Sequence, residues 1–122
     1  MAYERDIKDW TLDFAVLMVK FSIELKSKNV DTDIISQIRR SGTSIGANVR
    51  EAKASSSRKE LARFYDIALR SANETNFWLD VLEKGYEIEG KRIESIKIEL
   101  EQIEKVLGKI IVNLKKVAKP TF

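Results

Sequence analysis

One run of apolar residues in the last third of the chain constrains the fold more than any other feature. Eight apolar residues recur there at strictly alternating intervals of three and four: Ile93, Ile96, Leu100, Ile103, Leu107, Ile110, Leu114 and Val117. This spacing puts all eight side chains on one stripe of a helix, as in bundles and coiled coils whose helices pack nearly parallel. The run therefore predicts a long helix buried along one side.

Three other blocks also have helical spacing, and breakers are rare. The chain has five glycines and one proline, Pro120. The pattern predicts an all-α protein with a single domain over residues 1–122. Its helices are expected at about 4–27, 32–55, 58–84 and 91–118.

The second block contains an unusual stretch of small residues, SIGANVREAKASSS, at 44–57. Gly42, Thr43, Ser44, Gly46 and Asn48 together oppose a helix by roughly 3 to 4 kcal/mol relative to alanine. The helical rhythm nevertheless continues through them at Ile34, Ile38, Ser41, Ile45, Asn48 and Ala52. We expect a helix that only tertiary packing can hold, with a loop as the alternative.

The sequence gives little support for a nucleotide-binding phosphate loop, a metal site or a catalytic site. The glycines of GTSIG are too close for a P-loop, and no Lys-Ser/Thr pair follows them. Histidine and cysteine are absent, which removes the usual metal ligands, thiol chemistry and the usual general base. We expect no enzymatic activity, no metal or other cofactor, and no small-molecule substrate.

The sequence also gives no membrane signal. The N-terminal stretch MAYERDIKDW lacks an apolar signal core, and the longest apolar run is FAVLMV at 14–19. A bilayer-spanning helix needs about 20 apolar residues. We therefore expect a protein of the cytoplasm that does not enter a membrane.

The third block is apolar on more than one side. Besides its main stripe it carries Tyr65, Ile67, Leu69, Phe77, Leu79 and Val81 around much of the remaining surface. A helix of this kind is buried on more than one side. In a chain of 122 residues this suggests a second interface, most simply with another copy of the same chain.

Polar side chains interrupt the apolar stripes of the second and third blocks. We expect these residues to form a buried or interfacial hydrogen-bond network that fixes how the helices pair. The network would comprise Asn48, Glu51, Ser71, Glu74 and Thr75.

Basic residues are concentrated in the middle of the chain. Between Ile34 and Lys59 there are six basic residues and one acidic residue, Glu51. The candidate contacts for nucleic-acid phosphates are Arg39, Arg40, Arg50, Lys53, Arg58, Lys59 and Arg63. The alternative is an ordinary solvated surface with local ion pairs, and no base-stacking motif accompanies the charges.

Residues 37–75 resemble a known family: the small bacterial proteins encoded within intervening sequences of 23S ribosomal RNA genes. The matching positions are Arg39, Arg40, Ser44, Ile45, Asn48, Glu51, Lys59, Glu60, Arg63, Phe64, Ala68, Ser71 and Glu74. The chain departs from the family pattern at three positions. Gly46 stands where proline is common, Ala52 where glycine often ends the motif, and Arg70 where a small residue is usual.

The resemblance implies a left-handed up-down-up-down four-helix bundle that assembles into a homopentameric ring. It also implies an association with ribosomal RNA, so we expect a non-enzymatic oligomer that binds RNA or another nucleic acid through its basic surface. The alternative is a protein-interaction scaffold, or accessory subunit, whose basic face meets an acidic protein.

Overall fold

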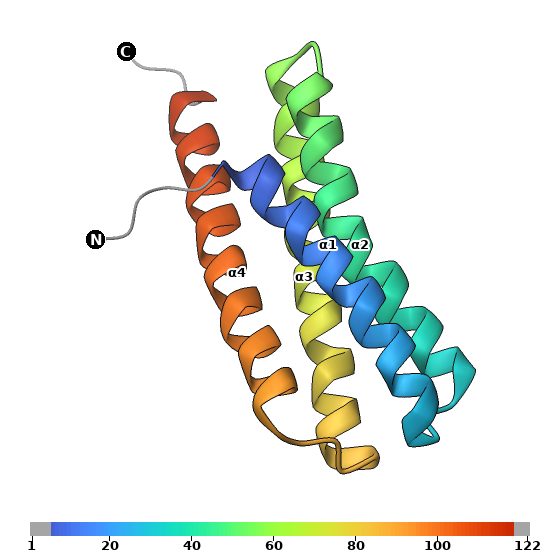
Figure 1. The fold of residues 1–122 in the computed structure, drawn as a ribbon. Coiled ribbons are helices and arrows are strands. Elements are labelled where there is room, and N and C mark those ends of the chain that lie inside the picture. Colours follow the sequence, from blue (N-terminus) through green and yellow to red (C-terminus); the bar gives the residue numbers. More distant parts are fainter. Residues whose placement is uncertain (1–5, 119–122) are drawn as a thin grey trace.

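The computed structural model describes residues 6–118, with side chains to residue 116. Its four helices are α1 (Ile7–Leu25), α2 (Thr32–Ala54), α3 (Arg58–Gly85) and α4 (Lys91–Ala118), and a 3-10 turn, η1 (Lys26–Lys28), follows α1 (Figure 1). No strand occurs in this part of the chain, so the all-α prediction is confirmed. The predicted start of the first helix at residue 4 and the side chain of Val117 lie outside the described residues.

Local signals explain where two of the helices begin. The carboxylate of Asp6 accepts a hydrogen bond of 2.8 Å from the backbone N–H of Lys8 at the start of α1. The hydroxyl of Ser57 accepts one of 3.1 Å from the backbone N–H of Glu60 at the start of α3. Such caps satisfy amides that the first helical turn leaves free. Only residues 55–57 separate α2 from α3, so these two helices run in opposite directions (Figure 1).

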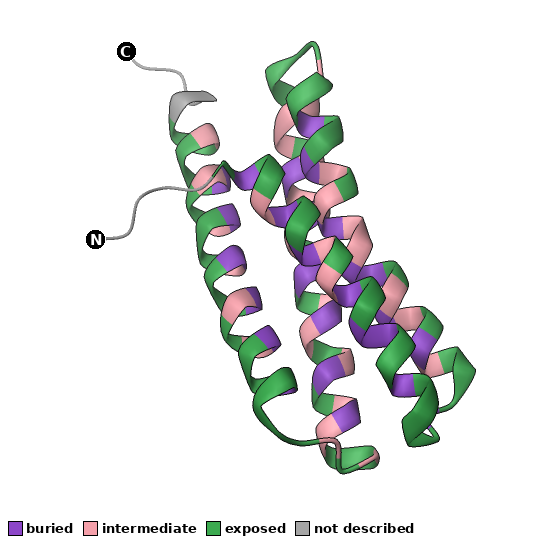
Figure 2. Cartoon of the chain, viewed as in Figure 1, coloured by how far each residue is buried: buried purple, intermediate pink, exposed green. Residues whose placement is uncertain are grey.

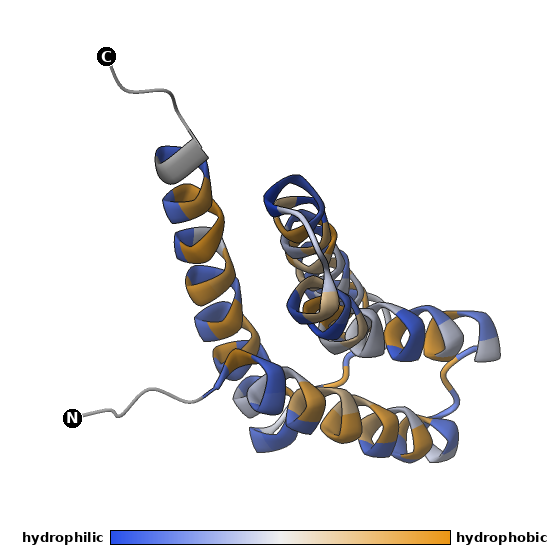
Figure 3. Ribbon diagram, turned by 90° about the horizontal axis from the view of Figure 1, so that it is seen from above, coloured by the Kyte–Doolittle hydropathy of each residue, from blue (hydrophilic) through white to orange (hydrophobic). Residues whose placement is uncertain are grey.

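The apolar stripe of α4 faces the other helices, as the buried residues in Figure 2 and the hydrophobic side of α4 in Figure 3 show. Ile93 through Leu107 of this stripe are fully or almost fully buried. Beyond Leu107 the prediction is wrong by one position: Ile111 is buried, whereas Ile110 and Leu114 are half-buried. Seven residues of a straight helix turn about 20° less than the two full turns of a strict 3-4 repeat, so the buried stripe moves forward to a neighbouring residue.

The stretch of small residues is helical, and its glycines allow α2 to approach α1 closely. A Cβ atom on Gly46 would lie 2.8 Å from the backbone carbonyl oxygen of Thr11. One on Gly42 would lie 2.7 Å from Cγ of Met18. Both distances are shorter than van der Waals contact. Tertiary packing therefore holds a helix that intrinsic propensity opposes.

Helix α4 packs mainly against α3. Salt bridges link α4 to α3 and to α1. Nζ of Lys97 lies 2.7 Å from both Oδ1 of Asp80 and Oε1 of Glu83 on α3. These hydrogen bonds raise the pKa of Lys97 above its usual value. Arg92 pairs with Glu24 of α1 at 2.7 Å. No helix in residues 6–118 has an apolar stretch that would carry it through a bilayer.

Candidate nucleic-acid interface

A line of hydroxyl groups joins α2 to α3 inside the protein. The hydroxyl oxygens of Ser41 and Thr75 are 3.0 Å apart, and Thr75 also donates to the carbonyl oxygen of Ser71 at 2.8 Å. Ser71 donates to the hydroxyl of Ser44 at 3.0 Å, and Nδ2 of Asn48 donates to the same hydroxyl at 3.0 Å. Every buried side-chain nitrogen or oxygen in the described residues has a hydrogen-bond partner. This network connects α2 to α3 within one chain.

Two predicted members of the network lie elsewhere. Oε2 of Glu74 accepts from the indole of Trp78 at 3.3 Å and lies 3.6 Å from Nη2 of Arg40, at the edge of the α2–α3 contact. Glu51 does not take part: it is exposed and makes no hydrogen bond or ion pair within the described residues. Glu51 follows Ser44 by seven residues and so lies on nearly the same side of α2, but its side chain remains exposed at the end of the helix.

The network gives a stability prediction. Replacing Thr75 by valine removes a fully buried hydroxyl and leaves that of Ser41 with only the carbonyl oxygen of Ile38, at 3.3 Å. We expect urea denaturation to show a loss of about 1 to 2 kcal/mol in the free energy of unfolding. Glu51→Ala is the control and should change it by less than about 0.5 kcal/mol. Equal stability of Thr75→Val and the original protein would contradict this role.

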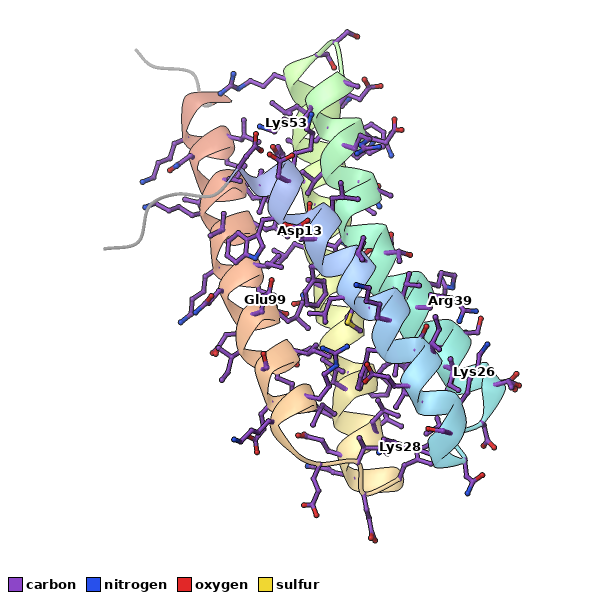
Figure 4. The ribbon with its side chains drawn as sticks, viewed as in Figure 1. Asp13, Lys26, Lys28, Arg39, Lys53 and Glu99 are labelled. Atoms are coloured by element: carbon purple, nitrogen blue, oxygen red, sulfur yellow. The ribbon has the colours of Figure 1, made fainter. Side chains whose placement is uncertain are left out.

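The predicted basic residues of α2 divide between two sides of that helix. Arg39, Arg50 and Lys53 fall within about 60° of one another, on the side of Gly46 and therefore beside α1. Arg50 and Lys53 are exposed and Arg39 is half-buried. Figure 4 shows Lys53 toward the end of α2 that joins α3 and Arg39 toward the opposite end. None of the three forms an ion pair within the described residues, which leaves their charges available to a ligand.

The remaining basic residues have different surroundings. Arg40 lies toward α3 and forms an ion pair with Glu74 of that helix. It also donates a hydrogen bond to the side chain of Gln37 on α2. Arg58 and Lys59 are exposed in the first turn of α3 and have no acidic partner among the described residues. The guanidinium carbon of Arg63 lies 4.5 Å from the ring centre of Phe64, in a cation–π contact. The structure thus leaves five of the seven predicted side chains without an ion pair or a cation–π contact within residues 6–116.

Sequence reasoning missed a second apolar stripe on α1. Leu12, Val16, Val19 and Ile23 are between 37% and 58% exposed and follow a 4-3-4 spacing. We call these four residues the outer stripe of α1. They lie roughly opposite the buried residues of that helix, and Figure 3 shows hydrophobic residues around much of α1. The 4-3-4 spacing of these four residues is visible in the sequence and would have indicated the stripe.

The exposed apolar surface of α1 is larger than the one that the sequence indicated on α3. The extra apolar residues of α3 are mostly covered within the chain: Leu79 is fully buried, and Leu69 and Val81 are half-buried. Phe77, at 58% exposed, is the exception among the large hydrophobic residues of α3. The exposed apolar run on α1 is longer and more regular. No group of three or more acidic side chains in the described residues is arranged to hold a metal ion.

Comparison with known proteins places this geometry in context. The model of a family described as 23S rRNA-intervening sequence protein matches residues 4–109. The fold is similar to the crystal structure of a protein with unknown function from the S23 ribosomal protein family of Bacteroides thetaiotaomicron VPI-5482. The two chains are 40% identical, with a TM-score of 0.82, over 87% of this chain and 98% of that one. No curated protein matches the sequence.

Proposed function

The chain belongs to the 23S rRNA-intervening sequence protein family, and from this premise we propose that it is a non-enzymatic oligomeric protein that binds RNA through the basic side of α2. The observation that carries the proposal is the row of Arg39, Arg50 and Lys53, which have no acidic partner in the described residues. Arg58 and Lys59 extend the row around the α2–α3 turn. Arginine and lysine without internal partners supply the sequence-independent, salt-dependent part of nucleic-acid affinity.

Self-association is part of the proposal. The unit would be a left-handed up-down-up-down bundle, and five units would close into a ring in the cytoplasm, where ribosomal RNA is found. The outer stripe of α1 supports this because four regularly spaced apolar side chains on one helix face suit packing against a second helix. Five chains would carry a formal charge of about +15, from +3 each, and would concentrate the field of the basic residues.

The test measures the affinity for a fluorescently labelled structured RNA at several salt concentrations. Removing the charges of Arg50 and Lys53 together, as Arg50→Gln with Lys53→Gln, should weaken binding about tenfold or more. It should also lower the slope of log affinity against log salt by about 1 for each lost phosphate contact. The control is Arg70→Gln, because Arg70 pairs with Asp66 on α3 at 3.3 Å. Salt-independent affinity, or an equal loss in the control, would contradict the proposal.

A protein-binding role is the second candidate. The outer stripe of α1 lies beside the basic residues of α2, and such a surface suits an amphipathic acidic protein as well as RNA. Purification from the native cells with and without nuclease separates the two candidates. RNA that is lost on nuclease treatment supports the first, whereas an acidic protein that stays bound supports the second.

A further inference from the structure

A groove of about 540 Å³ lies between the α2–α3 turn and the C-terminal half of α4. One end is polar and basic, with Lys53, Arg58 and the serines of residues 55–57. The other end is apolar, with Leu61, Ile110 and Leu114, and Tyr65 also lines the groove. Grooves of this size hold small molecules or single residues of a polymer.

The hydroxyl of Tyr65 is available to a ligand in this groove. Tyr65 is only 5% exposed, and its hydroxyl makes no hydrogen bond within the described residues. No fully buried side-chain oxygen there lacks a partner, so this hydroxyl has some contact with solvent, and Tyr65 is one of the residues that line the groove. A tyrosine buried to this extent normally finds a partner for its hydroxyl. A ligand in the groove would supply such a partner in place of water.

The two ends of the groove differ in charge. Lys53 and Arg58 stand beside the N-terminus of α3, whose backbone amides also favour an anion. Near Tyr65 the charge is of the opposite sign: burial, and then the carboxylate of Asp6, raise the pKa of the phenol above its usual value. An anionic group is therefore favoured at the turn, and a group that donates hydrogen bonds is favoured near Tyr65.

We propose that this groove holds one unpaired nucleotide of RNA, with its phosphate at Lys53 and Arg58 and its base between Leu61 and Leu114, the base edge meeting the hydroxyl of Tyr65. The inference rests on the proposed RNA-binding function and specifies the form of RNA: single-stranded or bulged rather than fully paired. A base in a duplex cannot enter, because its faces are stacked and its edge is paired.

The test compares two labelled RNAs, a single-stranded hexamer and the same sequence in a blunt duplex. Tyr65→Phe removes only the hydroxyl, and Leu114→Ser shortens one apolar wall. Each should weaken binding of the single strand about three- to tenfold, the worth of one hydrogen bond or a buried apolar contact, and leave duplex binding within about twofold. Val112→Ser is the matched control, because Val112 is on α4, is 51% exposed and does not line the groove.

A loss of binding in Tyr65→Phe can be distinguished from a loss of stability. The hydroxyl of Tyr65 has no internal partner, so Tyr65→Phe should keep the melting temperature of the original protein. Arg58→Gln should weaken binding of both RNAs, because a phosphate contact does not distinguish them. Unchanged single-strand binding in Tyr65→Phe and Leu114→Ser would overturn the inference while leaving RNA binding itself intact.

Competition identifies the ligand. A nucleoside 5′-monophosphate should displace the single strand at a concentration at least about tenfold lower than inorganic phosphate, because the base contacts add to the phosphate contacts. Equal competition would reduce the groove to a phosphate site and overturn the inference. If no RNA binds, the proposed function fails. The groove is then judged by whether the monophosphate shifts the backbone NMR signals of Ser56 and Leu61, and no shift would overturn it as well.

Discussion

Replacing Gly46 by alanine is expected to lower the free energy of unfolding by about 2 to 3 kcal/mol. The added methyl group would sit 2.8 Å from the carbonyl oxygen of Thr11 and 3.1 Å from its carbonyl carbon. Both are backbone atoms of α1, which cannot rotate away as a side chain can. The two helices must therefore separate, and the loss of packing along their whole contact exceeds the roughly 1 kcal/mol that alanine gains in helix propensity.

Two other glycines serve as controls in the same urea denaturation experiment. Gly108→Ala should raise the free energy of unfolding by about 0.5 to 1 kcal/mol, because nothing in the described structure lies within 4 Å of the new Cβ. Gly42→Ala should lower it, though by less than Gly46→Ala, because the new Cβ would meet side-chain rather than backbone atoms: Cγ and Cβ of the buried Met18, at 2.7 and 2.9 Å. If Gly46→Ala were as stable as Gly108→Ala, the close α1–α2 contact would be refuted.

The second large effect concerns assembly through the outer stripe of α1. Val16→Asp combined with Ile23→Asp would place one charge at the centre and one at an end of this stripe. Burying two unpaired carboxylates against another copy costs so much free energy that the copies should not associate. If five copies of the 14.0 kDa chain form the ring, light scattering should show a fall from about 70 kDa to about 14 kDa. The monomer should remain folded, because both side chains are exposed within the chain.

The matched control for the assembly experiment is Val112→Asp. It changes an apolar side chain of comparable exposure, 51%, on α4 and outside the outer stripe. Its mass should equal that of the original protein. A double variant that keeps its full assembled mass, or an original protein that is already a monomer, would contradict assembly through α1.

The fold was predictable where a single physical rule dominates. The 3-4 spacing of α4 indicated its helix, its buried side and its length, and failed only beyond Leu107, where the drift of a straight helix accumulates. The prediction for α2 was harder, because propensity and periodicity disagree there. The segment is helical because α2 packs closely against α1, and this packing outweighs the low helix propensity. The glycine is needed there because the contact of Gly46 with Thr11 leaves no room for a side chain.

The candidate site was predictable in part. The hydroxyl residues of the α2–α3 contact follow the apolar stripes, so Ser71 and Thr75 could be found by their spacing. Arg39 and Arg40 are adjacent in sequence, yet they lie about 100° apart on α2, and only one of them meets Glu74. The groove beside Tyr65 could not be predicted, because it depends on the distance between α4 and the α2–α3 turn. No local pattern sets that distance.

The position of α2 between two close neighbours divides its surface into parts that differ in how well they tolerate substitution. Toward α1 there is room only for glycine at Gly46, and toward α3 the hydroxyls of Ser41 and Ser44 are already engaged. Substitution on those two sides is penalised by folding alone. The strip that carries Arg50 and Lys53 escapes that penalty, because neither side chain is needed for packing. Substitutions on this one strip of one helix can therefore change the surface charge of the protein while its packing stays the same.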